Sequence, residues 1–129
     1  MATRSAIGIE NADGTVTAVY CHWDGYPENN GKILLEYYPE TETTKLISYG
    51  DISSLGEKID ETTFYGRDRG EENIDAVTYA NVEEYFNDFK GTVDYCYLLR
   101  NGNWTVSKSH NRRFVAVDKV LEQRERMYG

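Results

Sequence analysis

The sequence predicts a single α+β domain over residues 1–129, in which hairpins build a largely antiparallel sheet and three or four short helices pack against it. Two hairpin patterns predict the sheet, because apolar residues alternate around an Asp-Gly turn and again around an Asn-Gly turn. Short segments with helical spacing lie between and after these hairpins. A chain of 129 residues is long enough for one hydrophobic core and too short for a separate catalytic domain.

The first hairpin pattern covers residues 7–20, with the turn at Asn11-Ala12-Asp13-Gly14. A four-residue loop would keep the alternation in phase, so the apolar residues on both sides are expected on one face of the sheet. The second strand would then deliver His22 and Trp23 at its end, close to Arg4 and Ser5 at the start of the first. The apolar residues of this pattern are Ile7, Ile9, Val16, Ala18 and Tyr20.

The second hairpin pattern has the stronger turn signal, Asn101-Gly102. A two-residue turn at this position pairs Leu99 with Trp104 and Tyr97 with Val106. Shorter strands are expected over residues 62–65 and 74–79.

Four segments have helical spacing together with start or stop signals. Each is short, which agrees with helices that cover a sheet rather than form a bundle. They are residues 30–38, with Asn29 or Asn30 as the N-cap and Pro39 after the end; residues 41–49, followed by Gly50; residues 81–89, opened by the capping box Asn81-Val82-Glu83-Glu84; and a final helix capped by Asp118.

Charge is distributed unevenly along an acidic chain. The net charge is −8, which argues against nonspecific binding to nucleic acid or to an anionic membrane. From Arg100 onward seven basic and three acidic residues give +4, whereas residues 1–99 hold seven basic and 19 acidic residues, or −12. This division suggests a local anion site or a contact between unlike ends of two subunits, although a solvated basic helix face is the commoner cause of such a run.

The two cysteines, Cys21 and Cys96, fall within expected strands, and the chain has no signal peptide and no apolar run of membrane-spanning length. The expected location is therefore the cytoplasm, with reduced thiols. A zinc site built from these cysteines with His22 and His110, or a Cys21/His110 nucleophile pair, is formally possible. Neither has the spacing of a known metal or protease motif, so no metal, cofactor or catalytic residue is expected.

Three segments are candidates for ligand binding. The first is the turn after residue 20, which carries His22, Trp23 and Asp24 at a strand end. The second is the loop after Phe64 and Tyr65, where Arg67 and Arg69 alternate between glycines and could hold a phosphate or carboxylate from the same side. The plainer alternatives are that the aromatic residues close the edge of the core and that the arginines pair with Asp68, Glu71 and Glu72 in a surface network.

The third candidate segment contains Asn111, Arg112 and Arg113, just before the final helix, whose N-terminus would favour an anion. In an extended backbone the two adjacent arginine side chains diverge, so one is expected to face a ligand and the other the surface or a neighbouring subunit. Aromatic faces, guanidinium groups and amides together suit a small anionic nucleotide, whose base stacks and whose phosphates are bound by arginine.

The motifs Tyr20-Cys21-His22-Trp23-Asp24-Gly25-Tyr26-Pro27, Gly31-Lys32-Ile33-Leu34-Leu35, Gly50-Asp51-Ile52-Ser53-Ser54-Leu55-Gly56 and Phe64-Tyr65-Gly66-Arg67-Asp68-Arg69-Gly70-Glu71 resemble those of a family of small phage-encoded proteins. They cover roughly the first 75 residues; the C-terminal half matches no pattern of the family. The family looks like the Thoeris anti-defence sponge, which sequesters cyclic ADP-ribose isomers made by bacterial TIR enzymes. The resemblance implies a non-enzymatic, oligomeric protein that binds such a nucleotide without cleaving it in the cytoplasm of the infected host.

The sequence is also compatible with a different class of function. The −12 balance over residues 1–99 is compatible with an acidic protein-binding inhibitor that imitates DNA and blocks a host nuclease or regulator. Acidic and basic residues alternate through residues 57–72, however, which disfavours a continuous phosphate-like stripe. Eleven tyrosines and two tryptophans exceed what one small core can bury, so a homo-oligomer, a dimer or a multiple of dimers, is expected.

Overall fold

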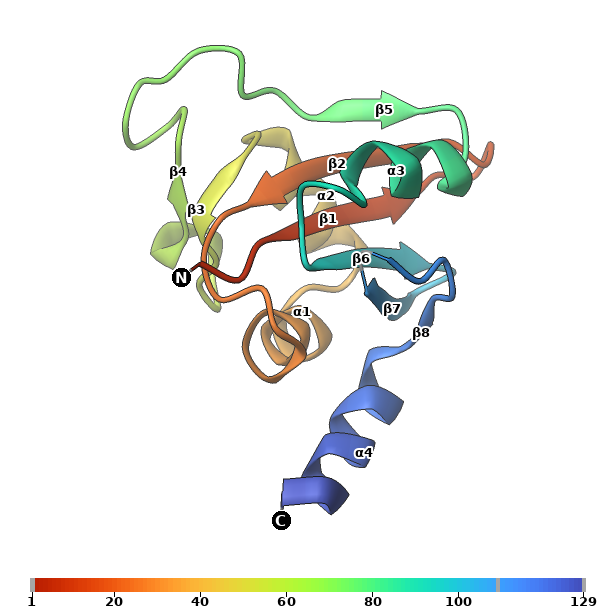
Figure 1. Cartoon of the computed structure of the whole chain (residues 1–129). Helices are drawn as coiled ribbons and strands as arrows, with labels where there is room; N and C mark the ends of the chain where they lie inside the picture. The colour runs from red at the N-terminus through yellow and green to blue at the C-terminus, as the bar shows by residue number, and fades with distance from the viewer. Residues whose placement is uncertain (1, 109, 129) are drawn as a thin grey trace.

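The computed structural model describes residues 2–108 and 110–128, and within these ranges it has four α-helices and an eight-stranded, mostly antiparallel sheet. The predicted α+β class is therefore confirmed. Helices cover both faces of the sheet, and the C-terminal helix projects away from the body of the molecule (Figure 1). No helix within the described ranges is long and apolar enough to cross a membrane.

The sheet has the order β4-β3-β2-β1-β6-β7-β8, and β5 pairs with β2 beside this path. Two neighbouring pairs are parallel, β1 with β6 and β2 with β3; the others are antiparallel. The strands are β1 (Ser5–Glu10), β2 (Val16–Cys21), β3 (Ile52–Ser54), β4 (Thr63–Phe64), β5 (Val77–Tyr79), β6 (Tyr95–Arg100), β7 (Asn103–Lys108) and β8 (Val115–Ala116).

The helices begin close to the expected positions, but two of the expected caps are wrong. Asp118, expected to cap the final helix, lies inside it, because that helix begins at Val117. The α-helices are α1 (Lys32–Tyr37), α2 (Glu40–Ser48), α3 (Val82–Phe89) and α4 (Val117–Tyr128), and a short 3₁₀ turn, η2, covers Ile59–Glu61. Asn81 is confirmed as the N-cap of α3, because its side chain accepts a hydrogen bond from the Glu84 amide. The cap expected at Asn29 or Asn30 is wrong: a π-helical turn, η1 (Pro27–Gly31), precedes α1, and Asn30 is buried in the core.

The first hairpin differs from the prediction in the faces that its residues occupy. Glu10 pairs with Val16, so the loop has five residues and not four. An odd loop shifts the alternation by one position. Ile7 and Ile9 consequently share a face with Val19 and Cys21, whereas Val16 and Ala18 lie on the opposite face.

Two hydrophobic clusters result, one on each face of the sheet. The larger lies between the sheet and α1, α2 and α4, and contains Leu34, Leu46 and Val117. The smaller lies under α3, with Tyr85 and Phe86 at its centre. The sheet is buried on both faces, and ligand-binding side chains are therefore expected at the ends of its strands.

The second hairpin is confirmed in register, with Leu99 opposite Trp104 and Tyr97 opposite Val106. The strands expected over 62–65 and 74–79 are present but shorter, as β4 and β5. Strand β1 of the first hairpin also pairs with β6 of the second, so Ser5 is a neighbour of both Cys21 on β2 and Tyr95 on β6.

Candidate functional site

The chain leaves the sheet at the end of β2 in a way that presents two aromatic side chains. The His22 amide donates to the Ile52 carbonyl and the Trp23 amide to the Ser53 carbonyl, each at 3.0 Å, which extends the pairing with β3. Asp24 then adopts a left-handed backbone conformation, with φ of 54°, and is exposed. Such a conformation in a residue other than glycine is uncommon and turns the chain sharply.

Two residues that follow Asp24, namely Gly25 and Asn30, hold this turn against the start of β1. The Gly25 amide donates to the Thr3 carbonyl at 2.8 Å, and a Cβ atom at this glycine would lie 2.7 Å from the Ser5 Cβ. The buried Asn30 amide donates to the Ser5 hydroxyl at 3.3 Å and to the Cys21 sulfur at 3.4 Å. Gly25 and Asn30 therefore position the loop and do not face a ligand.

The motifs around residues 22 and 65 meet at one patch, which we call the aromatic–arginine surface: Tyr20, His22, Trp23, Tyr65 and Arg69. The Tyr20 hydroxyl lies 2.7 Å from His22 Nδ1, and the His22 and Trp23 rings are perpendicular with centroids 4.7 Å apart. Arg69 lies over the Tyr65 ring, 5.1 Å from its centroid, and its Nη2 lies 3.4 Å from Ser53 Oγ. Ser53 thus contacts both halves of the surface.

Arg67 has a different environment from Arg69. Its guanidinium lies over the rings of Phe64 and Tyr49, at 4.6 and 5.6 Å, and pairs with Asp68 at 3.0 Å. It also donates to the Thr62 carbonyl at 2.7 Å. The hydrogen bond from Arg67 lowers the pKa of Asp68. Phe64 is fully buried beneath this arrangement and has no surface to offer a ligand.

The expectation that Arg67 and Arg69 face the same side is wrong for a local reason. The backbone is not extended after Phe64, because the Asp68 amide donates to the Phe64 carbonyl and the Gly70 amide to the Gly66 carbonyl. These bonds form a tight turn. Residues two apart in such a turn do not share a face as they do in a strand.

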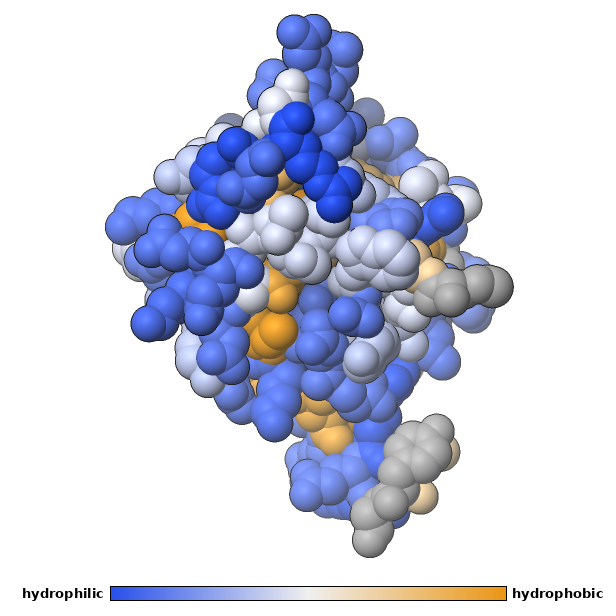
Figure 2. Space-filling view, turned by 90° about the vertical axis from the view of Figure 1, so that its left-hand side faces the viewer, coloured by the Kyte–Doolittle hydropathy of each residue, from blue (hydrophilic) through white to orange (hydrophobic). Residues whose placement is uncertain are grey.

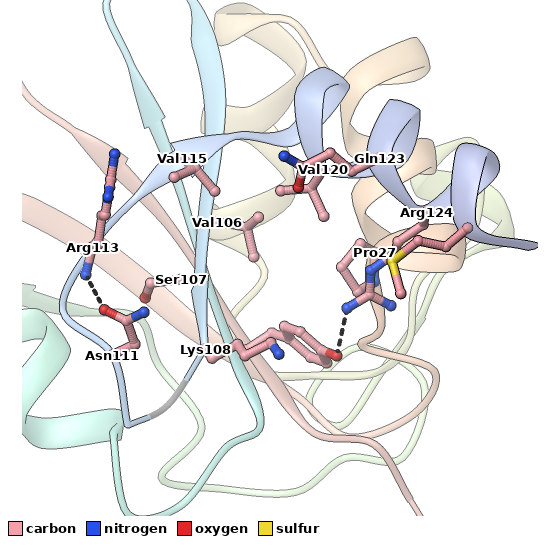
Figure 3. A pocket seen from close by; sticks show the side chains of 12 residues that line it. Pro27, Val106, Ser107, Lys108, Asn111, Arg113, Val115, Val120, Gln123 and Arg124 are labelled. Atoms are coloured by element: carbon pink, nitrogen blue, oxygen red, sulfur yellow. Dashed lines mark hydrogen bonds between the residues drawn. The ribbon is translucent and has the colours of Figure 1, made fainter.

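A separate cavity of about 430 Å³ lies between β7, β8 and α4, and we call it the α4 cavity (Figure 3). Two of the predicted site residues, Asn111 and Arg113, line it. Its other polar lining residues are Tyr95, Ser107, Lys108, Gln123 and Arg124. Apolar side chains complete the wall, namely Pro27, Val106, Val115, Val120 and Met127.

Ser107, at this wall, carries a buried polar group, its hydroxyl, without a hydrogen-bond partner among the residues that the structure describes. Asn111 lies beside it (Figure 3) and accepts a hydrogen bond from the Arg113 amide at 3.1 Å. A buried hydroxyl without a partner costs about 1–3 kcal/mol. Ser107 is paired with Cys96, whose side chain lies in the cluster under α3, whereas the adjacent Val106 lies on the face of α4. The buried hydroxyl therefore faces away from the interior of the cavity.

The α4 cavity is locally basic in an acidic protein. In the described part of the chain, neither Lys108 nor Arg113 forms an ion pair. Arg124 is held by Glu28, which does not line the cavity, at 2.8 and 3.1 Å, and by the Tyr95 hydroxyl in the cavity wall at 3.1 Å. Two unpaired cations and one oriented guanidinium therefore surround a space that suits a phosphate-bearing molecule.

The two adjacent arginines diverge, as the sequence predicted. Arg113 lines the cavity, whereas Arg112 Nη1 lies 3.3 Å from the carboxylate of Glu83 on α3. Both residues of this ion pair are exposed, so it contributes little to stability. Arg112 is therefore a natural control for Arg113.

The predicted site residues form two groups and not one pocket. Cys21, Ser5, Tyr95 and Lys108 stand side by side on β2, β1, β6 and β7, at the same end of the sheet. With strands about 4.8 Å apart, three spacings separate the β2 end from the β7 end by roughly 14 Å. The aromatic–arginine surface lies near the first end and the α4 cavity near the second. Tyr95, Ser107, Lys108 and Arg124 were not predicted.

The two cysteines are on opposite faces of the sheet, because Ser5 is paired with Cys21 and the adjacent Ala6 with Cys96. Burial raises the pKa of the Cys21 thiol to about 11 and that of Cys96 to about 12. Thiolate is the nucleophilic form, so both thiols are poorly reactive at neutral pH. Within the described residues, no group of three or more His, Cys, Asp and Glu side chains is arranged to hold a metal ion.

Comparisons of the chain with family models, with curated proteins and with solved structures find no match. Functional interpretation therefore depends on the contacts of the two sites and on the sequence motifs.

Proposed function

We propose that the protein binds a small anionic nucleotide in the α4 cavity and retains it unchanged. The proposed ligand class is that implied by the sequence resemblance, a cyclic ADP-ribose-type signal in the cytoplasm of a phage-infected host. Sequestration would deprive a TIR-dependent immune effector of its activating signal. The observation that carries the proposal is that Lys108 and Arg113 line the cavity of an acidic chain and that neither forms an ion pair within the described residues.

The size and chemistry of the cavity support this ligand class. Pockets for small molecules measure about 300–1,000 Å³, and the α4 cavity has about 430 Å³. Guanidinium and ammonium groups complement phosphate oxygens, while the Asn111 amide suits ribose hydroxyls. Tyr95 and the apolar wall offer contacts to a base. The ligand would thus meet cations on one side and apolar surface on the other.

Tight retention requires many contacts at once, and a second subunit could add to them. We propose that the chain acts as a homo-oligomer, a dimer or a multiple of dimers. Large apolar side chains are exposed on and around α4, among them Met127, Leu35 and Tyr26. Exposed side chains of this kind concentrate in interfaces between subunits.

The proposal is tested by binding and recovery of the ligand. The protein is incubated with a cyclic ADP-ribose isomer, separated from free ligand, heated, and the released molecule is identified by chromatography and mass. We expect the intact isomer from the wild type and from Arg112→Ala, and strongly reduced recovery from Arg113→Ala. Release of a linear or hydrolysed product would indicate an enzyme, and equal recovery from Arg112→Ala and Arg113→Ala would exclude the α4 cavity as the site.

A further inference from the structure

We infer that the aromatic–arginine surface is a second ligand site, which takes a planar aromatic ring bearing an anionic group, the chemistry of a nucleoside monophosphate. This inference does not rest on the function proposed for the α4 cavity. The two sites use different side chains and lie at the ends of different strands, β2 and β7, at the same end of the sheet. Figure 2 views the molecule from the side of β3 and β4, where residues of intermediate hydropathy adjoin strongly hydrophilic ones.

Trp23 provides the stacking platform. Its side chain is 45% exposed, although indole is among the largest apolar groups in the chain. The ring is nevertheless held in place, because His22 packs edge-on against it and the Tyr20 hydroxyl fixes His22. An exposed but oriented indole can stack on a nucleobase with little loss of conformational entropy.

Arg69 provides the anion contact. Of the residues described, none forms an ion pair with Arg69, even though the chain has 22 acidic residues and Arg67, two positions earlier, is paired with Asp68. One edge of its guanidinium reaches Ser53, and Tyr65 supports it from below. Its remaining N–H groups have no described acceptor, and they can bind two oxygens of one phosphate.

Ser53 brings the ring and the guanidinium within reach of a single ligand. Its carbonyl accepts from the Trp23 amide at 3.0 Å, and its hydroxyl contacts Arg69 at 3.4 Å. Arg4 lies at the same end of the sheet, because it precedes Ser5, which is paired with Cys21. Arg4 is exposed and, among the described residues, also lacks an ion pair. A base on Trp23 would therefore have its phosphate near Arg69, with the positive charge of Arg4 at the same end of the sheet.

The test is to titrate the full chain separately with AMP, adenosine and inorganic phosphate. Each titration is monitored through the NMR resonance of the Trp23 indole N–H. The second tryptophan, Trp104, is 4% exposed and serves as an internal reference. We expect AMP to shift the Trp23 resonance at lower concentration than either adenosine or phosphate. Both Trp23→Ala and Arg69→Gln should weaken AMP binding, measured by calorimetry, about tenfold.

Arg112→Ala and Arg113→Ala are the controls, and both should leave AMP binding at this surface unchanged. If Arg113→Ala removes AMP binding while Trp23→Ala and Arg69→Gln retain it, AMP occupies the α4 cavity and the inference is overturned. A Trp23 resonance that responds to protein concentration and not to AMP would assign the surface to contact with a second copy, which also overturns it. Loss of cyclic ADP-ribose binding in Arg113→Ala tests only the α4 cavity and does not bear on the aromatic–arginine surface.

Discussion

Arg124 and Glu28 are 96 residues apart, and Arg124 Nη1 lies 2.8 Å from Glu28 Oε1. This contact fastens the projecting helix α4 to the turn η1, and it orients one guanidinium at the α4 cavity. The carboxylate of Glu28 also neutralises part of the positive charge that an anionic ligand would use.

Glu28→Gln should therefore strengthen binding of an anionic nucleotide while it weakens the fold slightly. Removing one negative charge near the ligand is worth about 1 kcal/mol, or roughly fivefold in affinity. Both side chains are partly exposed, so the loss of unfolding free energy should stay below about 1 kcal/mol. Calorimetry and chemical denaturation measure the two effects; weaker binding in this variant would mean that Glu28 acts only by orienting Arg124.

Gly25→Ala should destabilise the protein. The added methyl group would lie 2.7 Å from Ser5 Cβ and 2.9 Å from the Thr3 carbonyl oxygen, so the turn must separate from the start of β1. Overpacking of this kind costs about 1–3 kcal/mol. The control is Gly91→Ala, where no atom lies within 4 Å of the added group. Equal denaturation midpoints for the two variants would contradict the structural role of Gly25.

Arg67→Ala should lower the melting temperature, whereas Arg69→Ala should leave it close to that of the wild type. Arg67 covers Phe64 and Tyr49 and bonds the Thr62 carbonyl, and its removal exposes the edge of the core. Arg69 is exposed, and its contacts are one long hydrogen bond to Ser53 and the Tyr65 ring beneath it. Thermal unfolding of the two variants under identical conditions measures this difference, and the reverse order would show that the two roles are exchanged.

Stability should fall at alkaline pH because of the buried thiols. Burial in the folded protein raises the pKa of the Cys21 thiol to about 11 and that of Cys96 to about 12, above the ordinary thiol value of 9.0. A raised pKa means that the folded state holds the proton more tightly, so this stability is complete below about pH 9 and is lost as pH rises toward the folded values. Denaturation at pH 8 and pH 10 should show a lower unfolding free energy at pH 10. Rapid reaction of both thiols with an alkylating reagent at pH 8 in the native protein would contradict their burial.

Local signals predicted the elements of this fold well. Asn101-Gly102 fixed the register of β6 and β7, and Asn81 fixed the start of α3, because both depend on a few adjacent residues. The faces of the first hairpin were predicted wrongly, since they depend on whether Thr15 belongs to the loop. One residue more in the loop reverses every side chain that follows.

The sites were predicted less completely because they depend on contacts between distant segments. His22, Trp23, Tyr65 and Arg69 come together only because β2 and β4 both pair with β3. Tyr95 and Arg124 join Asn111 only because α4 returns to the end of β6. The sequence predicted that the side chains of Arg112 and Arg113 point in different directions. It did not predict the turn that separates Arg67 from Arg69.

The two adjacent arginines offer the most direct test of the proposed function. Calorimetric titration of a cyclic ADP-ribose isomer into the wild type, Arg113→Ala and Arg112→Ala compares equal changes of charge one residue apart. Loss of a charge-assisted contact costs about 1.5–3 kcal/mol, so Arg113→Ala should bind roughly ten- to hundredfold more weakly, and Arg112→Ala should bind like the wild type. Unchanged affinity in Arg113→Ala, with both variants fully folded, would contradict the α4 cavity as the nucleotide site.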